Sequence, residues 1–243
     1  MSRNRLAVVT GANSGIGKSI VKTLSREGWR IVLSGRNETR LRETAGGNDI
    51  IVTGDLNSPS TIKKLVQTVQ ETRSPLQLLV NNAGIVHRTG FIETSDESWM
   101  EQMDTNFMSA VRLTRALLRF FADRETSIIN VSSTLGIRPI QDHSAYSASK
   151  AAMNNWTQSL ALELAPRIRV NAVCPGLVDT PIQPFHGEKD SSSSRQSAHA
   201  LQPLGRMGRP EDIAEMVAYL ASDKAAWITG SIFTVDGGIS LRS

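Results

Sequence analysis

The sequence predicts an α/β fold in which one doubly wound parallel sheet carries helices on both faces. Two observations lead to this fold class. Short apolar segments of about four to six residues alternate with longer segments of helical periodicity along the whole chain. A glycine-rich turn also joins the first apolar segment to the first helical one. Because no linker-like change in composition and no internal repeat interrupts this alternation, we expect a single domain over residues 1–243.

The strands are expected where apolar residues run without a helical period. Such short runs, rich in Val, Ile and Leu, are typical of strands that are buried on both faces of a sheet. In chain order, strands are expected at 5–10, 30–34, 50–54, 76–81, 127–132, 167–174 and 232–235.

The helices are expected between the strands, where apolar residues recur at helical spacing, as Ile16 and Ile20 do. Ser58 is expected to cap a helix that begins at Pro59, and Pro210 opens the last helix, because proline suits the first helical position. In chain order, helices are expected at 16–27, 38–44, 59–73, about 95–123, 144–164 and 210–221.

The composition excludes several classes of protein. With 40% hydrophobic and 21% charged residues, the chain is neither disordered nor a coiled coil. The single cysteine, Cys174, excludes an intrachain disulfide, and the four histidines lack metal-ligand spacing, so no metal is expected. A net charge of +4 is too mild to indicate a nucleic-acid partner. No apolar run approaches the roughly 20 residues of a membrane span, so we expect a cytoplasmic protein with no membrane partner.

One segment, at about 181–203, shows neither periodicity. It holds four consecutive serines, 191–194, and three prolines. A loop of this length inside a compact domain is usually functional or disordered. Two interpretations stay open: a lid over a substrate site, or an inert surface insertion.

The turn after the first strand indicates a dinucleotide site. Gly11, Gly15 and Gly17 lie between the first strand and the first helix, with the spacing Gly-x-x-x-Gly-x-Gly. Glycines at such a junction permit a tight turn and a close backbone approach. The N–H groups and the positive dipole end of the helix can then meet a pyrophosphate.

Four motifs, in this order and spacing, resemble those of the classical short-chain dehydrogenase/reductase family. They are Thr10-Gly11-x-x-x-Gly15-Ile16-Gly17, Asn81-Asn82-Ala83-Gly84, Tyr146-x-x-x-Lys150 and Pro175-Gly176. The resemblance covers nearly the whole chain. It implies a Rossmann fold of seven parallel strands with helices on both faces, and a homotetramer.

The end of the second strand predicts NADP(H) as the cofactor. An NAD-dependent enzyme places a carboxylate there for the ribose 2′-hydroxyl, whereas a 2′-phosphate needs positive charge. Ser34 is small and neutral where NAD-dependent relatives carry Asp, and Arg36 can form charge-assisted hydrogen bonds with a phosphate. With the contacts that the resemblance implies, the expected cofactor-binding residues are Gly11, Asn13, Ser14, Gly15, Ile16, Gly17, Arg36, Asp55, Leu56, Asn82, Ala83, Gly84, Tyr146, Lys150, Pro175, Gly176, Val178 and Thr180.

Tyr146 and Lys150 are the expected centre of catalysis. They are four residues apart in a helix and share a face. A phenol with a pKa near 10 is a poor acid or base at neutral pH, and a nearby ammonium is expected to lower that pKa. The pair would then serve as a general acid for carbonyl reduction or a general base for alcohol oxidation.

Two further catalytic residues follow from the resemblance. Ser133 lies thirteen residues before Tyr146, as the family's catalytic serine does, and would hydrogen-bond the substrate oxygen. Ser132 is interpreted as structural. Asn106 matches the asparagine that holds a water in the family's proton relay. A helix-kink role for Asn106 stays open beside that one.

The substrate is the least determined part of the site. Residues 203–214, 228–230 and 235–238 resemble the 3-oxoacyl-[acyl-carrier-protein] reductases, although relatives of other specificity share them. Arg124 and Arg167 fall where those reductases dock an acidic carrier protein. A solvated or subunit-interface basic face, which would include Arg112, Arg115 and Arg119, is the alternative. The expected substrate contacts are Ser133, Leu135, His143 and Tyr146, with Ile85, Val86, His87, Arg138 and the 181–203 loop nearby.

Three functions are therefore considered. The first is an NADPH-dependent reductase of 3-oxoacyl thioesters in fatty acid biosynthesis. The second is an NADP-linked enzyme of the same family that acts on a sugar, a polyol, a small ketone or a steroid-like alcohol. The third is a dinucleotide-binding regulator without activity. The presence of Asn106, Ser133, Tyr146 and Lys150 argues against the third, because binding alone does not need a phenol beside an ammonium.

Overall fold

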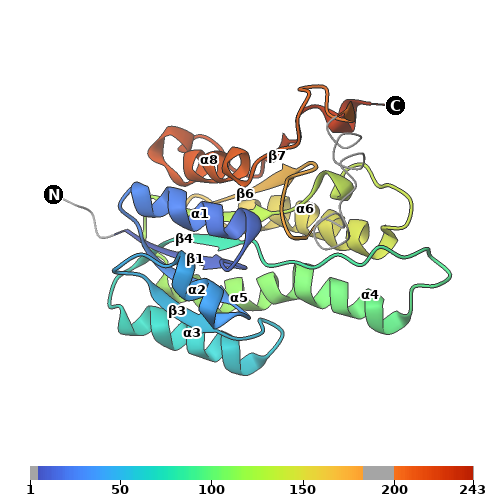
Figure 1. Ribbon diagram of the computed structural model, residues 1–243. Helices are drawn as coiled ribbons and strands as arrows, with labels where there is room; N and C mark the ends of the chain where they lie inside the picture. The colour runs from blue at the N-terminus through green and yellow to red at the C-terminus, as the bar shows by residue number, and fades with distance from the viewer. Residues whose placement is uncertain (1–4, 183–199, 243) are drawn as a thin grey trace.

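A seven-stranded parallel sheet forms the centre of the molecule (Figure 1). The computed structural model describes residues 5–182 and 200–242. Neighbouring strands follow the order β3-β2-β1-β4-β5-β6-β7, and every pair is parallel. The strands are β1 (Leu6–Thr10), β2 (Arg30–Gly35), β3 (Ile50–Thr53), β4 (Leu76–Asn81), β5 (Thr126–Val131), β6 (Ile168–Pro175) and β7 (Ile232–Val235). The predicted fold class is confirmed.

Helices cover both faces of the sheet. On one face, α1 and α8 lie side by side, with α2 next to α1 (Figure 1). On the other face, α3, α5 and α6 pack against β1, β4 and β5. The helices are α1 (Gly15–Arg26), α2 (Glu38–Thr44), α3 (Pro59–Glu71), α4 (Asp96–Met103), α5 (Ser109–Leu117), α6 (Ser144–Leu164) and α8 (Pro210–Ala221).

The residues of β1 show how the sheet holds these two layers together. Ala7 and Val9 belong to the core beneath α1 and α8, whereas Leu6 and Val8 belong to the core beneath α3 and α5. Successive side chains of a strand point to opposite faces, and all four of these are buried. A central strand that is apolar at every position is what a sheet covered on both faces requires.

The expected helix at 95–123 is interrupted. It consists of α4, a π-helical segment η1 (Asp104–Met108), α5 and a short 3-10 segment η2 (Leu118–Phe120). Arg112 forms an ion pair with Asp104 across the wider turn. Asn106 lies inside η1 and is fully buried. Its proposed place at a helix kink therefore agrees with the structure, because a π-helical turn is a local irregularity of this kind.

The predicted N-cap of α3 lies at the expected residue, but it lacks the expected side-chain hydrogen bond. Ser58 lies at the N-cap position of α3, and Pro59 is the first helical residue, as expected. The Ser58 hydroxyl, however, makes no hydrogen bond with the helix backbone. It lies 2.8 Å from Oγ of Ser60 instead. The helix starts at the predicted residue without the predicted stabilising contact.

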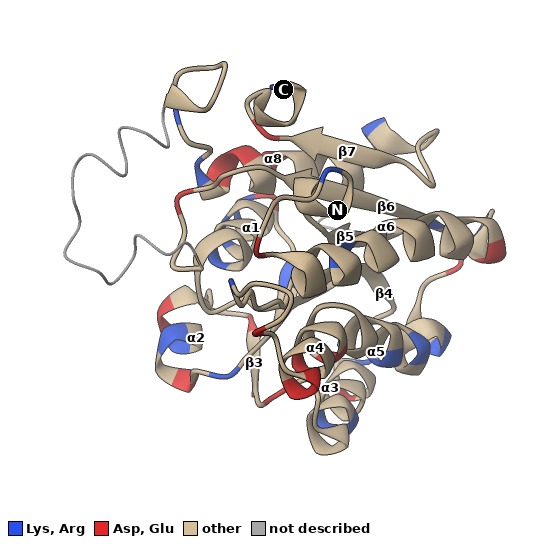
Figure 2. Cartoon of the chain, turned by 90° about the vertical axis from the view of Figure 1, so that its right-hand side faces the viewer, with Lys and Arg blue, Asp and Glu red and all other residues tan. Residues whose placement is uncertain are grey.

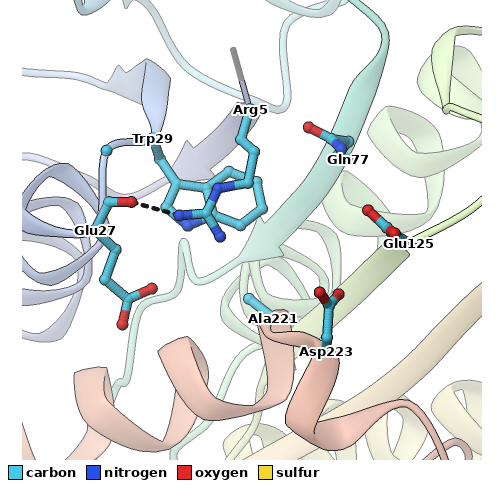
Figure 3. A pocket seen from close by; sticks show the side chains of 8 residues that line it. Arg5, Glu27, Trp29, Gln77, Glu125, Ala221 and Asp223 are labelled. Atoms are coloured by element: carbon cyan, nitrogen blue, oxygen red, sulfur yellow. Dashed lines mark hydrogen bonds between the residues drawn. The ribbon is translucent and has the colours of Figure 1, made fainter. Parts of the chain in front are cut away.

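The amino-terminal edge of the strands holds a polar pocket of about 330 Å³ (Figure 3). The Arg5 guanidinium lies 4.4 Å from the centre of the Trp29 ring and donates a hydrogen bond to the backbone oxygen of Glu27. A cation over an indole face is a favourable contact. Gln77, Glu125 and Asp223 complete the wall. None of the predicted catalytic or cofactor-binding residues lies at this edge.

Most of the expected 181–203 loop lies outside the described residues, since 183–199 are not described. Both interpretations of this loop therefore remain predictions. Within the described part of the chain, no helix combines the length and the apolar character that a membrane crossing requires.

Candidate active site

The predicted site residues come together at the carboxyl ends of the strands, where the turns after β1, β4, β5 and β6 meet. The strand order reverses direction between β1 and β4, because the chain runs from β1 outward to β3 and then returns to β4. In open α/β sheets, ligands bind in the crevice at such a switch point. The turns after β1 and β4 form this crevice.

The three glycines of the first turn each lie where a side chain would not fit. Gly11 has φ +63°, and a β-carbon on it would lie 2.8 Å from Nδ2 of Asn82. Gly15 has φ +50° and faces the side chain of Thr180. A β-carbon on Gly17 would overlap the backbone oxygen of Gly11. The turn is thus tight enough for the start of α1 to approach a pyrophosphate closely.

Side-chain hydrogen bonds fix the turns after β1 and β4 to each other. The Thr10 hydroxyl accepts hydrogen bonds from the backbone N–H groups of Asn82 and Ala83, at 2.9 and 3.0 Å. The Asn82 side chain donates back to the backbone oxygens of Thr10 and Gly11, at 2.9 and 3.3 Å. The wall of the crevice is therefore set by contacts within the protein itself.

The other predicted cofactor residues also border the crevice. Ser14 precedes α1 and makes no capping hydrogen bond with its hydroxyl. Thr180 is buried against Gly15, which brings the segment after β6 to the glycine turn. Gly176 follows β6, and a β-carbon on it would lie 2.6 Å from Cβ of Asp236. Val178 and Leu56 are buried, Ile16 is half-buried, and Pro175 ends β6.

The end of β2 lies beside the glycine turn. Ser34 is fully buried, and no described residue forms a hydrogen bond with its hydroxyl. The role of Ser34 in the choice of nucleotide stays a prediction. The next residue, Gly35, faces Asn13 of the glycine turn. Arg36 follows, is exposed, and forms no ion pair with a residue that the structure describes.

The turn after β3 is connected to the catalytic side of the site. The Asp55 carboxylate accepts a hydrogen bond from the backbone N–H of Asn57, at 2.9 Å, which shapes this turn. The Asn57 side chain donates to the Thr105 hydroxyl at 2.8 Å. Thr105 immediately precedes Asn106, so the expected adenine-binding turn and η1 are in direct contact.

Tyr146 and Lys150 face each other on α6 as predicted, with Nζ of Lys150 5.8 Å from the centre of the tyrosine ring. Their protonation differs from the expectation. Burial raises the pKa of Tyr146 to about 12, and a hydrogen bond with Ser133 only partly opposes this. Burial also lowers the pKa of Lys150 to about 8. The expected lowering of the phenol pKa is thus wrong for the ligand-free protein, because desolvation is the larger effect.

The two serines at the end of β5 have different surroundings. Ser132 is buried and donates to the backbone oxygen of Lys150 at 3.1 Å, which agrees with its structural interpretation. The Ser133 hydroxyl accepts a hydrogen bond from the backbone N–H of Leu135 at 3.1 Å. It also interacts with Tyr146. Ser133 and the phenol can therefore meet one substrate oxygen from two sides.

Asn106 is fixed by the turn after β4 and by α6. Its carboxamide oxygen accepts from the backbone N–H of Ile85 at 2.7 Å. Its amide group donates to the backbone oxygen of Ile85 and to the Ser149 hydroxyl, each at 3.0 Å. Gly84 lies between Asn106 and Lys150, since a β-carbon on it would be 3.2 Å from Oδ1 of Asn106 and 3.6 Å from Nζ of Lys150.

Ser149 is a site residue that the sequence interpretation missed. Its hydroxyl accepts from Asn106 and donates to the backbone oxygen of Tyr146 at 2.7 Å. The sequence did contain a signal for this role. Ser149 lies three residues after Tyr146, so its side chain projects near the same side of α6 as the tyrosine. What the sequence could not show is that η1 places Asn106 opposite it.

The structure places the predicted substrate residues next to Ser133 and before α6, and it gives the histidines among them partners within the protein. Leu135 follows Ser133 in the short segment η3 (Thr134–Gly136). His143 precedes α6, and its Nδ1 lies 2.8 Å from the backbone oxygen of Gln141. His87 forms an ion pair with Glu101 when protonated, at 3.1 Å. Both histidines thus have partners within the protein.

The fold and the site together define a class of protein. A parallel sheet with a glycine-lined crevice, beside a buried lysine and a half-buried tyrosine, is the arrangement of a nicotinamide-dependent oxidoreductase. A family model described as Enoyl-(Acyl carrier protein) reductase matches residues 11–240. The chain belongs to the classical short-chain dehydrogenase/reductase family.

Relatives of different activity are similar to the chain to nearly the same degree. A 3-oxoacyl-[acyl-carrier-protein] reductase of Thermotoga maritima is 33% identical, with 97% of each chain covered. A 3beta-hydroxysteroid dehydrogenase of Eggerthella lenta is 34% identical, over 98% of this chain and 95% of the relative. The crystal structure of a glucose/ribitol dehydrogenase of Brucella melitensis superposes with a TM-score of 0.92 at 31% identity, over 98% and 97% of the two chains.

The crevice fits the nicotinamide dinucleotide that the family implies. β-Carbons at Gly11, Gly15 and Gly17 would press against Asn82, Thr180 and the Gly11 backbone, so the tight turn that brings the start of α1 close to a pyrophosphate requires glycine at these positions. When bound, the cofactor supplies the hydride. Among the described residues, no group of His, Cys, Asp and Glu side chains could hold a metal ion.

Proposed function

We propose that the protein reduces a carbonyl to an alcohol with NADPH, with Tyr146 as the proton donor. The observation that carries this proposal is the meeting of Tyr146, Ser133, Lys150 and Asn106 beside the glycine-lined crevice. A pKa of about 12 keeps the phenol protonated at neutral pH, as a general acid must be before it acts. An inactive regulator would have no need of this arrangement.

Each of the four residues has a proposed part in the proton transfer. Ser133 holds the substrate oxygen, and the Tyr146 phenol gives its proton to that oxygen as negative charge develops there. The Lys150 ammonium, which donates to the backbone oxygen of Val131 at 2.9 Å, stabilises the phenolate that remains. Asn106 lies near Lys150 and is proposed to hold a water that links the lysine to solvent, so that Tyr146 can regain its proton through Lys150.

Arg36 is proposed to select NADPH over NADH. Its exposed guanidinium follows β2 and can bind a 2′-phosphate with charge-assisted hydrogen bonds. Arg36→Ala is expected to reduce the NADPH preference, measured as the ratio of kcat/KM values, by roughly 10- to 150-fold, the equivalent of about 1.5–3 kcal/mol. Arg42→Ala is the matched control, because Arg42 is paired with Glu38 on α2. An unchanged ratio in Arg36→Ala, or a wild type that prefers NADH, contradicts the cofactor assignment.

The proposed substrate class is a 3-oxoacyl thioester. Support comes from the resemblance of residues 203–214 and 235–238 and from the relative in Thermotoga maritima. The alternative is an alcohol or ketone of the steroid or sugar type, supported by the other two relatives. Turnover of acetoacetyl-CoA with NADPH, beside a panel of steroids and aldoses with both nicotinamides, separates the two.

An acidic carrier protein is proposed as the partner, docking near Arg124 and Arg167. Basic residues gather along α5 (Figure 2), although Arg112 forms an ion pair with Asp104. Arg167 also has a structural task, since its guanidinium donates to the backbone oxygens of Leu118 and Phe121 at 3.2 and 2.7 Å. Arg124 is exposed and is the cleaner probe.

Reversing Arg124 and Arg167 to Glu is expected to raise KM for a carrier-linked 3-oxoacyl substrate. Turnover of the same acyl group on a small uncharged thioester should be nearly unchanged. The carrier reaction of the wild type should weaken with salt, which screens charges over about 8–10 Å. Arg124→Glu alone should reproduce part of the effect, and Arg167→Lys, which keeps the charge, should not. Equal loss with both substrates would assign the arginines a structural role only.

The remaining proposals concern the setting of the reaction. We propose one domain over residues 1–243 and a homotetramer in the cytoplasm. Cys174 is buried and unpaired, which suits a reducing compartment. Sedimentation velocity at micromolar concentration measures the oligomeric state directly.

A further inference from the structure

Gln102 is a buried polar side chain that the proposed mechanism does not use. It lies on α4 with only 1% of its surface exposed. Its carboxamide oxygen accepts a hydrogen bond from the backbone N–H of His87 at 3.0 Å, and its amide group donates to the backbone oxygen of Ser98 at 3.4 Å. Burial of a carboxamide is unfavourable without such partners. Gln102 therefore suits this position only while the segment after β4 stays against α4.

Gln102 and Asn106 together bind one edge of the segment 84–89, which follows β4. Asn106 binds both backbone groups of Ile85, and Gln102 binds the N–H of His87, two residues further on. Backbone groups two residues apart point to the same side of an extended chain, as in a strand that pairs with its neighbour. Two side chains of the α4–η1 region thus take the place of a neighbouring strand for this segment.

The same segment also reaches the start of α6 at two places. Near its beginning, a β-carbon on Gly84 would lie 3.6 Å from Nζ of Lys150. Near its end, the N–H of Thr89 donates to the backbone oxygen of Asp142 at 3.0 Å. Tyr146 lies midway between positions 142 and 150. The middle of the segment therefore passes the turn of α6 that carries the proposed proton donor.

Val86 is the residue in the middle of this segment, and it is held only through its neighbours. Its backbone N–H and C=O form no hydrogen bond with a residue that the structure describes. The alternation along an extended chain turns these groups away from α4. Without the bond from His87 to Gln102, the chain after Ile85 would have its next backbone anchor only at Thr89.

We infer that Gln102 is a positioning residue for the proposed reduction, which holds Val86 and its neighbours in the arrangement that receives the substrate beside Tyr146. The inference rests on the proposed function. When only a fraction of the molecules has the binding-competent arrangement, the apparent affinity falls by that fraction. Loss of the bond to His87 should therefore raise KM for the carbonyl substrate. It should leave kcat near the wild-type value, because the hydrogen bonds of Gln102 go to none of the four proposed catalytic residues.

The test compares Gln102→Met with Gln102→Glu, using acetoacetyl-CoA or the member of the steroid and aldose panel that the wild type reduces. Methionine has nearly the size of glutamine and lacks the accepting oxygen, whereas glutamate keeps an oxygen that can accept from His87. Gln102→Met should raise KM by roughly 3- to 10-fold, as expected for one lost hydrogen bond. Its kcat and its dissociation constant for NADPH should stay near the wild-type values, and Gln102→Glu should restore KM. Gln67→Met, on the exposed side of α3, is the matched control.

A second pair of variants removes the same bond from the donor's side. Proline has no N–H, so His87→Pro should raise KM relative to His87→Ala by a factor similar to that of Gln102→Met. The histidine side chain is absent from both of these variants, so the comparison isolates the backbone bond. It also keeps the inference testable if melting temperatures show that Gln102→Met has lost its fold.

Hydrogen exchange of the peptide that covers 84–89 gives a readout that needs no substrate. Exchange should be faster in Gln102→Met than in the wild type and in Gln102→Glu. A folded Gln102→Met with the wild-type KM, a loss confined to kcat, or unchanged exchange of this peptide would each overturn the inference. A wild type that reduces no member of the panel would instead refute the proposed function, and the exchange result would then decide by itself whether Gln102 holds the segment.

Discussion

Replacing Tyr146 with phenylalanine is expected to lower kcat for carbonyl reduction by about 10²–10⁴-fold, the usual contribution of a general acid. The substitution keeps the ring in its half-buried place on α6 and removes only the hydroxyl. Because the cofactor crevice lies mainly in the turns after β1 and β4, NADPH should still bind with near wild-type affinity. Steady-state rates and a fluorescence titration of NADPH measure the two quantities separately.

Tyr219→Phe is the matched control for this experiment. Tyr219 is the other tyrosine of the chain, on α8, and its hydroxyl lies 3.5 Å from the backbone oxygen of Lys224. Its replacement should leave kcat unchanged. If Tyr146→Phe retained most of its kcat, Tyr146 would have no part in the proton transfer.

Replacing Lys150 with methionine is expected to abolish most activity and, at the same time, to stabilise the ligand-free protein. Burial lowers the Lys150 pKa from 10.5 to about 8. One pH unit corresponds to about 1.4 kcal/mol, so the buried charge costs about 3 kcal/mol at neutral pH. Loss of the hydrogen bond to Val131 offsets about 1 kcal/mol of this. The free energy of unfolding at pH 7 should therefore rise by about 1–2 kcal/mol.

The stability difference between Lys150→Met and wild type should depend on pH. Between pH 8 and 10.5 the unfolded chain binds the Lys150 proton and the folded chain does not, so wild-type stability rises with pH in this window. The advantage of Lys150→Met should accordingly shrink as the pH rises. Urea unfolding at pH 7 and pH 9.5 measures it, with the exposed Lys22→Met as control. A Lys150→Met protein that is less stable than wild type at both pH values would contradict the assignment of an unfavourable buried charge.

Much of the fold was accessible from local sequence patterns. The bounds of α2, α6 and α8 and of β4 and β7 agree with the predicted ranges. Their ends carry strong local signals, such as Pro210 at the start of α8. The ends of β1, β3 and β5 differ by one residue, which is the usual uncertainty of an element that frays into a turn.

The features that the sequence did not predict depend on contacts between distant segments. The π-helical turn forms where Asn106 meets Ile85, and no local periodicity marks it. The direction of Ser34 and Gly35 depends on which strand face the glycine turn covers. The raised pKa of Tyr146 depends on how deeply the whole site is buried. A motif can place two residues on one helix face, but it does not report the solvent around them.

The hydrogen bonds of Thr10 have a consequence for the order of folding. This hydroxyl joins the first βα turn to backbone groups 72 and 73 residues further along the chain. A nascent chain that has completed only β1, α1 and β2 therefore has the glycine motif but not the crevice. The nucleotide cannot act as an early template for such a chain, because its site forms only after β4 has inserted beside β1. Because non-local contacts slow folding, we expect a bound nucleotide to stabilise the finished fold without speeding its assembly.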